Sequence, residues 1–173
     1  MKNKLNLLCL GGILATTFCA NAVQRDITVT ADIDPTVDVT NADGSPLPSS
    51  VAMQYLPGKG LAAHKENIKF WSNKEDKALS VSLANTPTLT DANGSNAIPL
   101  SVSVNGTKLS TTPITLEYAT AFPSGIANGS STMPLVIAQD NPGPVTAAGS
   151  YTGIVSMVVT QATAPAEKPG GNK

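Results

Sequence analysis

The stretch VQRDITVTADIDP, residues 23–35, contains the strand pattern that decides the fold class. Its apolar side chains fall at every second position, at Ile27, Val29, Ala31 and Ile33. A period of two residues predicts a β-strand that buries one face. The same alternation returns in residues 51–55, 79–83, 98–104, 114–118 and 133–137, and Asn-Gly, Asp-Gly and Pro-Gly turns separate these segments. The sequence therefore predicts an all-β fold, a β-sandwich.

Residues 1–22 have the three parts of a secretory signal peptide. Lys2 and Lys4 precede an apolar run, and small residues close the segment at Ala20-Asn21-Ala22. Both cysteines, Cys9 and Cys19, fall inside this segment, so we expect an exported mature chain without disulfides, stabilised by packing. Removing the signal leaves 151 of the 173 residues, which is enough for one domain with a core of its own.

Charge and residue types argue against two classes of function. Loss of the signal leaves nine basic residues against twelve acidic ones, so no nucleic acid partner is expected. His64 is the only histidine, the mature chain has no thiol, and catalytic motifs such as G-x-S-x-G are absent from the sequence. We interpret His64 as a solvated residue and expect neither an enzyme nor a cofactor or zinc site.

Two segments are predicted to form turns, and one of them has to be compared with a calcium-binding loop. Residues 98–109 predict a hairpin, because Asn105-Gly106 can take the positive φ values of a type I′ turn. The segment DANGSN, residues 91–96, is oxygen-rich like a calcium loop. Its glycine is misplaced for that pattern and no closing glutamate follows, which favours a simple turn.

The last strand pattern covers residues 151–160. Tyr151, Val155, Met157 and Val159 share one face, and Ile154 and Val158 share the other. Apolar residues on both faces predict a central, well-covered strand. Residues 162–173 are rich in Ala, Pro and Gly without an apolar period, and we expect a disordered tail there.

The opening strand has two interpretations. It can pair within its own sandwich, or it can enter the core of another molecule. Asp34-Pro35 follows it directly, and proline cannot continue a hydrogen-bonded ladder, so Pro35 is expected to be a stiff hinge between strand and body. No inward charge interrupts its apolar face from Ile27 to Ile33, although an exposed edge strand normally needs one.

Three segments resemble the major pilins of the class 5 fimbriae, which the alternate chaperone-usher pathway assembles and which include the colonisation factor antigens. They are ITVTADIDP, LPSSVAMQY and GSYTGIVSMVVT. The resemblance implies an incomplete immunoglobulin-like sandwich, residues 35–161, that is completed by a strand donated from the next subunit. It implies that residues 23–34 are the donor strand, inserting Ile27, Val29, Ala31 and Ile33 into an acceptor groove. Tyr151, Val155, Met157 and Val159 would line that groove.

The resemblance also implies a location and partners. The chain would pass through the periplasm to a fimbria on the cell surface, as its major structural subunit supporting adhesion. Its partners would be identical subunits, a periplasmic chaperone, an outer-membrane usher and a minor tip adhesin. The alternative function is a self-contained secreted β-sandwich that binds a ligand or receptor.

A local basic run surrounds Phe70-Trp71 at Lys65, Lys69, Lys74 and Lys77. The simpler interpretation is a charged surface strand with Trp71 packed beneath it. The functional interpretation is that Lys69 and Trp71 contact a neighbouring subunit or a host surface receptor, because tryptophan stacks on sugars and on protein alike.

Overall fold

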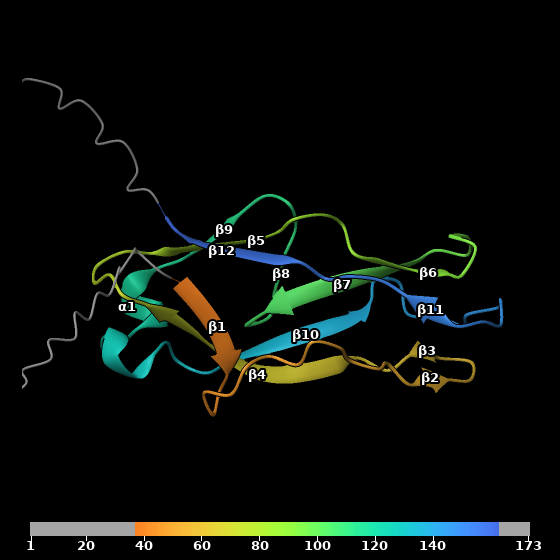
Figure 1. Ribbon diagram of the computed structural model, residues 1–173, viewed down its shortest axis with the longest axis horizontal. Helices are drawn as coiled ribbons and strands as arrows, with labels where there is room; N and C mark the ends of the chain where they lie inside the picture. The colour runs from red at the N-terminus through yellow and green to blue at the C-terminus, as the bar shows by residue number, and fades with distance from the viewer. Residues whose placement is uncertain (1–36, 163–173) are drawn as a thin grey trace, which may run out of the picture. The chain divides into compact units, whose positions relative to one another are not determined.

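The computed structural model describes residues 37–162. The predicted signal peptide, the opening strand with Ile27, Val29, Ala31 and Ile33, the hinge Pro35, and residues 163–173 of the predicted tail lie outside the described residues. The described chain is almost entirely β-structure, as predicted, and Figure 1 shows the arrangement. Its strands are β1 (Val37–Asn41), β2 (Tyr55–Leu56), β3 (Gly60–Leu61), β4 (His64–Ser72), β5 (Leu79–Leu83), β6 (Thr88–Asp91), β7 (Ile98–Val104), β8 (Thr107–Lys108), β9 (Ile114–Leu116), β10 (Met133–Gln139), β11 (Tyr151–Thr152) and β12 (Met157–Gln161).

The larger sheet has the strand order β1-β4-β10-β7-β6-β11, with β8 paired to β7. Its pairs are antiparallel; β4 faces β10 with Ile68 opposite Met133, and β10 faces β7 with Ile137 opposite Val102. The β7–β8 hairpin is the predicted type I′ turn, because both Asn105 and Gly106 have positive φ.

The smaller sheet contains three strands of the described chain, in the order β12-β5-β9. Alternate side chains of β5 are buried, and with the inward side chains of β4, β7 and β10 they form one hydrophobic core. Phe70 and Phe122 are its largest fully buried side chains. Two sheets over a common core make the predicted sandwich, but among residues 37–162 β12 is hydrogen-bonded to a strand on one side only, at β5.

Three predicted strands differ from the structure, and the first two are at residues 51–55 and 114–118. Residues 51–54 form no strand, and only Tyr55–Leu56 pairs, with β3. Tyr118 begins a short helix, α1 (Tyr118–Ala121), in place of ending a strand, because the chain turns there and stacks the Tyr118 and Phe122 rings 5.5 Å apart. A 3₁₀ turn, η1 (Ile126–Asn128), follows.

The predicted central strand at residues 151–160 is instead two strands, β11 and β12, of which β12 is an edge. Ile154 is 75% exposed and Val158 is 42% exposed, so the described residues do not cover the second apolar face. Gly153 separates the two strands. A Cβ there would collide with the Thr88 carbonyl oxygen, so glycine lets the chain cross β6 closely before it joins the other sheet.

Candidate functional site: a groove beside an unpaired strand edge

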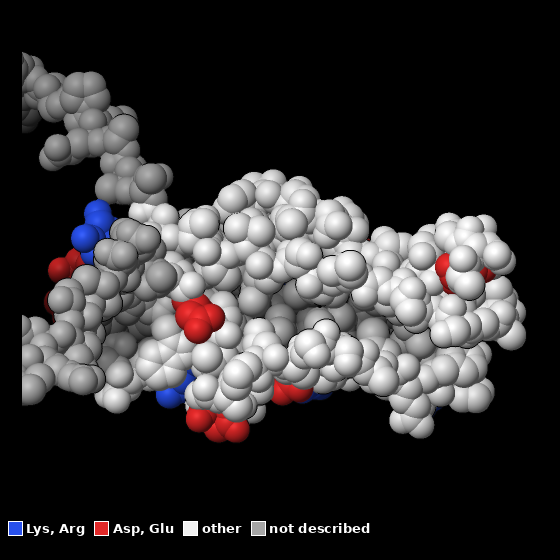
Figure 2. Space-filling model, in the orientation of Figure 1, with Lys and Arg blue, Asp and Glu red and all other residues white. Residues whose placement is uncertain are grey.

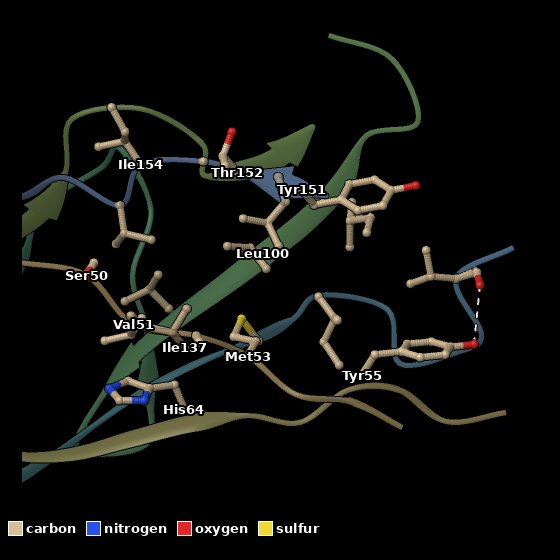
Figure 3. A pocket seen from close by; sticks show the side chains of 18 of the residues that line it. Ser50, Val51, Met53, Tyr55, His64, Leu100, Ile137, Tyr151, Thr152 and Ile154 are labelled. Carbon is tan, nitrogen blue, oxygen red and sulfur yellow. Dashed lines mark hydrogen bonds between the residues drawn. The ribbon is translucent and has the colours of Figure 1, made fainter. Parts of the chain in front are cut away.

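An apolar groove of about 1080 Å³ opens where the smaller sheet stops short of covering the larger one. Residues 47–55 form one wall and residues 151–157 the other. Figure 2 shows a furrow on this face whose visible surface is mostly uncharged, and Figure 3 shows several of the side chains that line it. At one end, the Tyr55 hydroxyl lies 3.4 Å from the Val145 carbonyl oxygen, to which it donates.

The floor of the groove is built from the inward faces of β4, β10, β7 and β6. Antiparallel register places these side chains in successive rows across the strands. The rows run through Glu66 and Leu135, then His64, Ile137 and Val102, then Leu100, and finally Ile98 and Leu89. Because floor rows recur every two residues, the groove matches the side-chain period of an extended strand.

The first wall, residues 47–55, carries the alternating pattern of a strand but lacks a partner strand over most of its length. Within residues 37–162, Pro46 bridges to Thr40 just before the wall begins, and backbone pairing resumes only at Gln54. Val51 is 41% exposed and Tyr55 is 46% exposed. Val51 lies on the unpaired part of the wall and Tyr55 on β2, and exposed apolar side chains gathered in this way are typical of interaction surfaces.

The second wall continues into the free edge of β12. The Ala84 N–H donates to the Ser156 carbonyl at 2.9 Å, and the Ala162 N–H donates to the Ala78 carbonyl at 2.8 Å. Even-numbered residues of this strand therefore direct their backbone groups toward β5. The N–H and C=O groups of Val155, Met157 and Val159 point the other way, where no strand of the described chain accepts or donates hydrogen bonds.

The predicted acceptor residues are only partly brought together at the groove. Tyr151, Val155 and Met157 line it and are half-buried. Val159 lies beyond the groove and packs half-buried against the hydrophobic core. The Tyr151 hydroxyl donates to the Ala147 carbonyl at 2.8 Å, which fixes the ring at the end of the groove.

His64 and Glu66 are lining residues that the sequence reasoning missed. His64 was expected to be solvated, but the Nε2 atom is shielded from water and the side chain is only 21% exposed. Nε2 lies 3.2 Å from Glu66 Oε1, yet it is not aligned for a hydrogen bond with it. The sequence spacing could have revealed this, because His64 and Glu66 are an even number of residues from buried Ile68 and Phe70 and therefore lie on the same face of β4.

Lys69 and Trp71 lie on the opposite face of β4. Phe70, not Trp71, is the aromatic residue packed beneath the strand. Trp71 Nε1 donates to Thr40 Oγ1 at 2.8 Å, and the ring covers Gly129, where a Cβ would come within 3.2 Å of it. Lys69 Nζ donates to the Asn128 carbonyl at 3.3 Å. Both side chains thus hold the η1 segment or β1 to β4, and their contact with a neighbouring subunit or host receptor stays a prediction.

The DANGSN segment forms the turn after β6. The Asp91 carboxylate accepts hydrogen bonds from the backbone N–H groups of Asn93 and Ser95, at 3.0 and 2.8 Å, and from Asn96 Nδ2 at 2.7 Å. The Asn96 bond, followed by the backbone bonds, lowers the pKa of Asp91 below its ordinary value. Within residues 37–162, no group of three or more His, Asp or Glu side chains is placed to hold a metal ion. No helix of that range is long and apolar enough to cross a membrane.

Known proteins with similar sequences and structures share this fold. Residues 23–160 match the family of CS1 type fimbrial major subunits. A CS1 fimbrial subunit of Escherichia coli is 38% identical over 94% of this chain and 99% of its own length. A CFA/I fimbrial subunit of Escherichia coli O78:H11 (strain H10407 / ETEC) is 39% identical over 87% of this chain and 95% of its own.

Among solved structures, the CooA pilin subunit from enterotoxigenic Escherichia coli superposes with a TM-score of 0.65 at 36% identity, covering 75% of this chain and 89% of that one. The predicted likeness to class 5 major pilins is thereby confirmed. A sandwich with an unpaired edge, a family match over most of the chain and relatives that align over nearly their full length agree: the chain belongs to the family of CS1 type fimbrial major subunits.

Proposed function

We propose that this fimbrial major subunit polymerises by donating residues 23–34 to the groove of the next copy. The observation that carries the proposal is the free backbone edge at Val155, Met157 and Val159, which borders an apolar groove. A strand laid there would become the fourth strand of the smaller sheet and would cover the floor of the larger one. Adding a strand to an open sheet edge is a known mode of recognition, of which pilin complementation is a recognised example, and the geometry of this chain fits it.

The donor segment and the groove match in number and spacing. Four floor rows face the groove, and Ile27, Val29, Ala31 and Ile33 supply four apolar side chains on one face. Both sets repeat every two residues, roughly 7 Å along a strand. Burying the three larger side chains contributes about 1.5–3 kcal/mol each, so the face contributes on the order of 5–10 kcal/mol before ordering costs. A domain is typically stable by only about 5–15 kcal/mol, so an unfilled groove leaves a marginal subunit.

The direction of the donated strand follows from where the chain enters the sandwich. β1 begins at Val37, opposite Ser72, at the end of the larger sheet farthest from β11 (Figure 1). The subunit's own donor segment therefore leaves from that end. A linear fibre needs the neighbouring body at the other end, near Tyr151, so the donated Ile33 lies near Tyr151 and Ile27 lies toward Met157 and Glu66. Such head-to-tail contacts do not close on themselves and produce a filament.

The remaining roles complete the same proposal. Residues 1–22 direct export to the periplasm and are removed on the way, and the family match beginning at Val23 supports that boundary. A periplasmic chaperone covers the groove until an outer-membrane usher replaces it with a donor strand, and a minor tip adhesin begins the fibre. Pro35 is the hinge between donor strand and domain, residues 162–173 are a tail outside the sandwich, and the subunit performs no catalysis.

The test replaces Val29 by Asp in the full chain, with Thr28→Asp as the matched control on the opposite strand face. A charge buried in the groove should stop fibre growth, whereas the control should assemble normally. The readouts are surface fibres, counted by electron microscopy, and thermal unfolding of the chaperone-bound subunit. Fibres of normal length from Val29→Asp contradict the proposal. A lowered melting temperature of the isolated variant monomer would instead favour the self-contained sandwich, in which the strand stabilises its own domain.

A further inference from the structure

Glu66 presents a carboxylate to an otherwise apolar groove. Its side chain is 31% exposed and lies on the inward face of β4, in the same row as Leu135. Within residues 37–162, His64 is the only basic group within ion-pair distance of it, and its Nε2 atom is not aligned to donate. A purely apolar strand that filled the groove would remove water from this carboxylate without replacing its hydrogen bonds, which is unfavourable.

The donor segment contains a matching group. Arg25 is the only arginine of the chain. It is two residues before Ile27, so in an extended strand it lies on the same face as the apolar side chains. A guanidinium offers several donors in a fixed fork, which suits a carboxylate that lacks aligned partners.

We propose that Arg25 of the donating subunit pairs with Glu66 of the accepting subunit, beside His64, and helps to set the register of the donated strand. The inference rests on the proposed donor exchange and adds a specific contact to it. With Ile27 over the row of Glu66 and Leu135, Arg25 lies one row farther, about 7 Å along the strand, and its long side chain reaches back to the carboxylate.

The Arg25–Glu66 pair disfavours a shifted register of the donated strand, which apolar burial alone would barely distinguish from the correct register. A slip of two residues keeps apolar side chains facing the floor. In one direction, that slip places Arg25 two rows from Glu66, about 14 Å along the strand and beyond its reach, so a desolvated carboxylate loses its partner. In the other direction the two charges stay close, but Ile33 is carried past the last floor row, at Ile98 and Leu89, and loses its burial. The charge pair and the end of the groove thus limit the register from opposite sides.

The experiment exchanges the charges in the full chain: Arg25→Glu, Glu66→Arg, and both together. The polymer yield is normalised to the amount of exported subunit. Each single variant should assemble about tenfold less than the wild type or worse, because two like charges then meet in the groove, and the double variant should recover most of the loss. Asp26→Lys and Lys65→Glu are matched controls, since these neighbours lie on the opposite faces of the donor strand and of β4.

A second series uses neutral substitutions, so the pair can still be tested if Glu66→Arg does not fold. Glu66→Gln leaves Arg25 buried without a counter-ion, so adding Arg25→Gln to Glu66→Gln should raise the polymer yield. Equal yields across both series, with Val29→Asp still blocking growth, overturn the charge pair and leave donor exchange intact. If Val29→Asp also assembles normally, the donor-strand proposal itself fails.

Discussion

Asp91 shows how one carboxylate organises the end of the groove. It closes the turn after β6 with three hydrogen bonds, and it lies opposite Tyr151 in the register of β6 with β11. These bonds favour the ionised form and lower its pKa, with the Asn96 amide as the largest cause. The turn therefore lies next to the wall residue Tyr151, at the end where the next subunit is proposed to dock.

Replacing Asp91 by Asn should lower the thermal stability of the fibre at neutral pH. A carboxyl whose folded-state pKa is lowered stabilises the fold above its unfolded-state pKa, about 3.9, and this contribution is lost as pH falls through the lower folded value. The difference in melting temperature between wild type and Asp91→Asn should thus be largest at pH 7 and shrink below about pH 4. Asp76→Asn, at a positive-φ turn position that asparagine also accepts, is the control. A difference that stays constant from pH 7 to pH 3 would show that the charge is not the cause.

Among the strand elements, the sequence predicts β5 and β7 correctly, and each of these has a paired strand on both sides within residues 37–162. The alternation at residues 79–83 and 98–104 corresponds to β5 and β7, which have paired strands and buried alternate side chains. The same alternation at residues 51–54 forms no strand, and at residues 151–160 it forms two. The two segments whose structure differs from the prediction are the two walls of the groove.

The physical reason is that alternating apolar residues predict a face to be buried but do not predict which segment covers that face. Ile154 and Val158 are apolar but exposed in the single chain. Period-two reasoning interpreted them as evidence of a covered, central strand. His64 and Glu66 were missed for the opposite reason, because polar residue types suggested solvent while their register on β4 points them inward.

Hydrogen exchange along β12 should distinguish a donated strand from other ways of covering the groove. The amides of Val158 and Thr160 face β5 and should be protected both in isolated subunits and in fibres. Those of Met157 and Val159 face the free edge and should become protected only in the fibre. Residue-resolved exchange, measured after fibres are dissolved under quench conditions, gives this alternation. Uniform protection of all four amides in isolated subunits would mean that the edge is already paired within one chain.

In the whole molecule, the donor strand can enter either the groove of its own domain or that of the next subunit. The strand would run along the groove in opposite directions in these two arrangements. Val37, where the described chain begins, lies at the end far from Tyr151, so a strand folded back into its own groove would be expected to place Ile33 near the Leu47 end. A strand from the next subunit would place Ile33 near Tyr151 instead.

Pairs of introduced cysteines can report which end of the groove Ile33 occupies, because the mature chain is predicted to have no cysteine of its own and any disulfide must join the introduced residues. Ile33→Cys combined with Tyr151→Cys should cross-link neighbouring subunits on mild oxidation, giving a ladder of covalent oligomers in denaturing gels. Ile27→Cys combined with Tyr151→Cys is the matched control and should give no ladder, because the two positions lie at opposite ends of the groove.

Ile33→Cys combined with Leu47→Cys tests the alternative, since a self-inserted strand would form a disulfide within one monomer. A monomeric disulfide from that last pair, with no ladder from the first, would exclude exchange between subunits and leave a closed sandwich. A ladder from the first pair alone establishes both the donor and its direction, since a disulfide requires the two Cβ atoms to approach within about 4.5 Å.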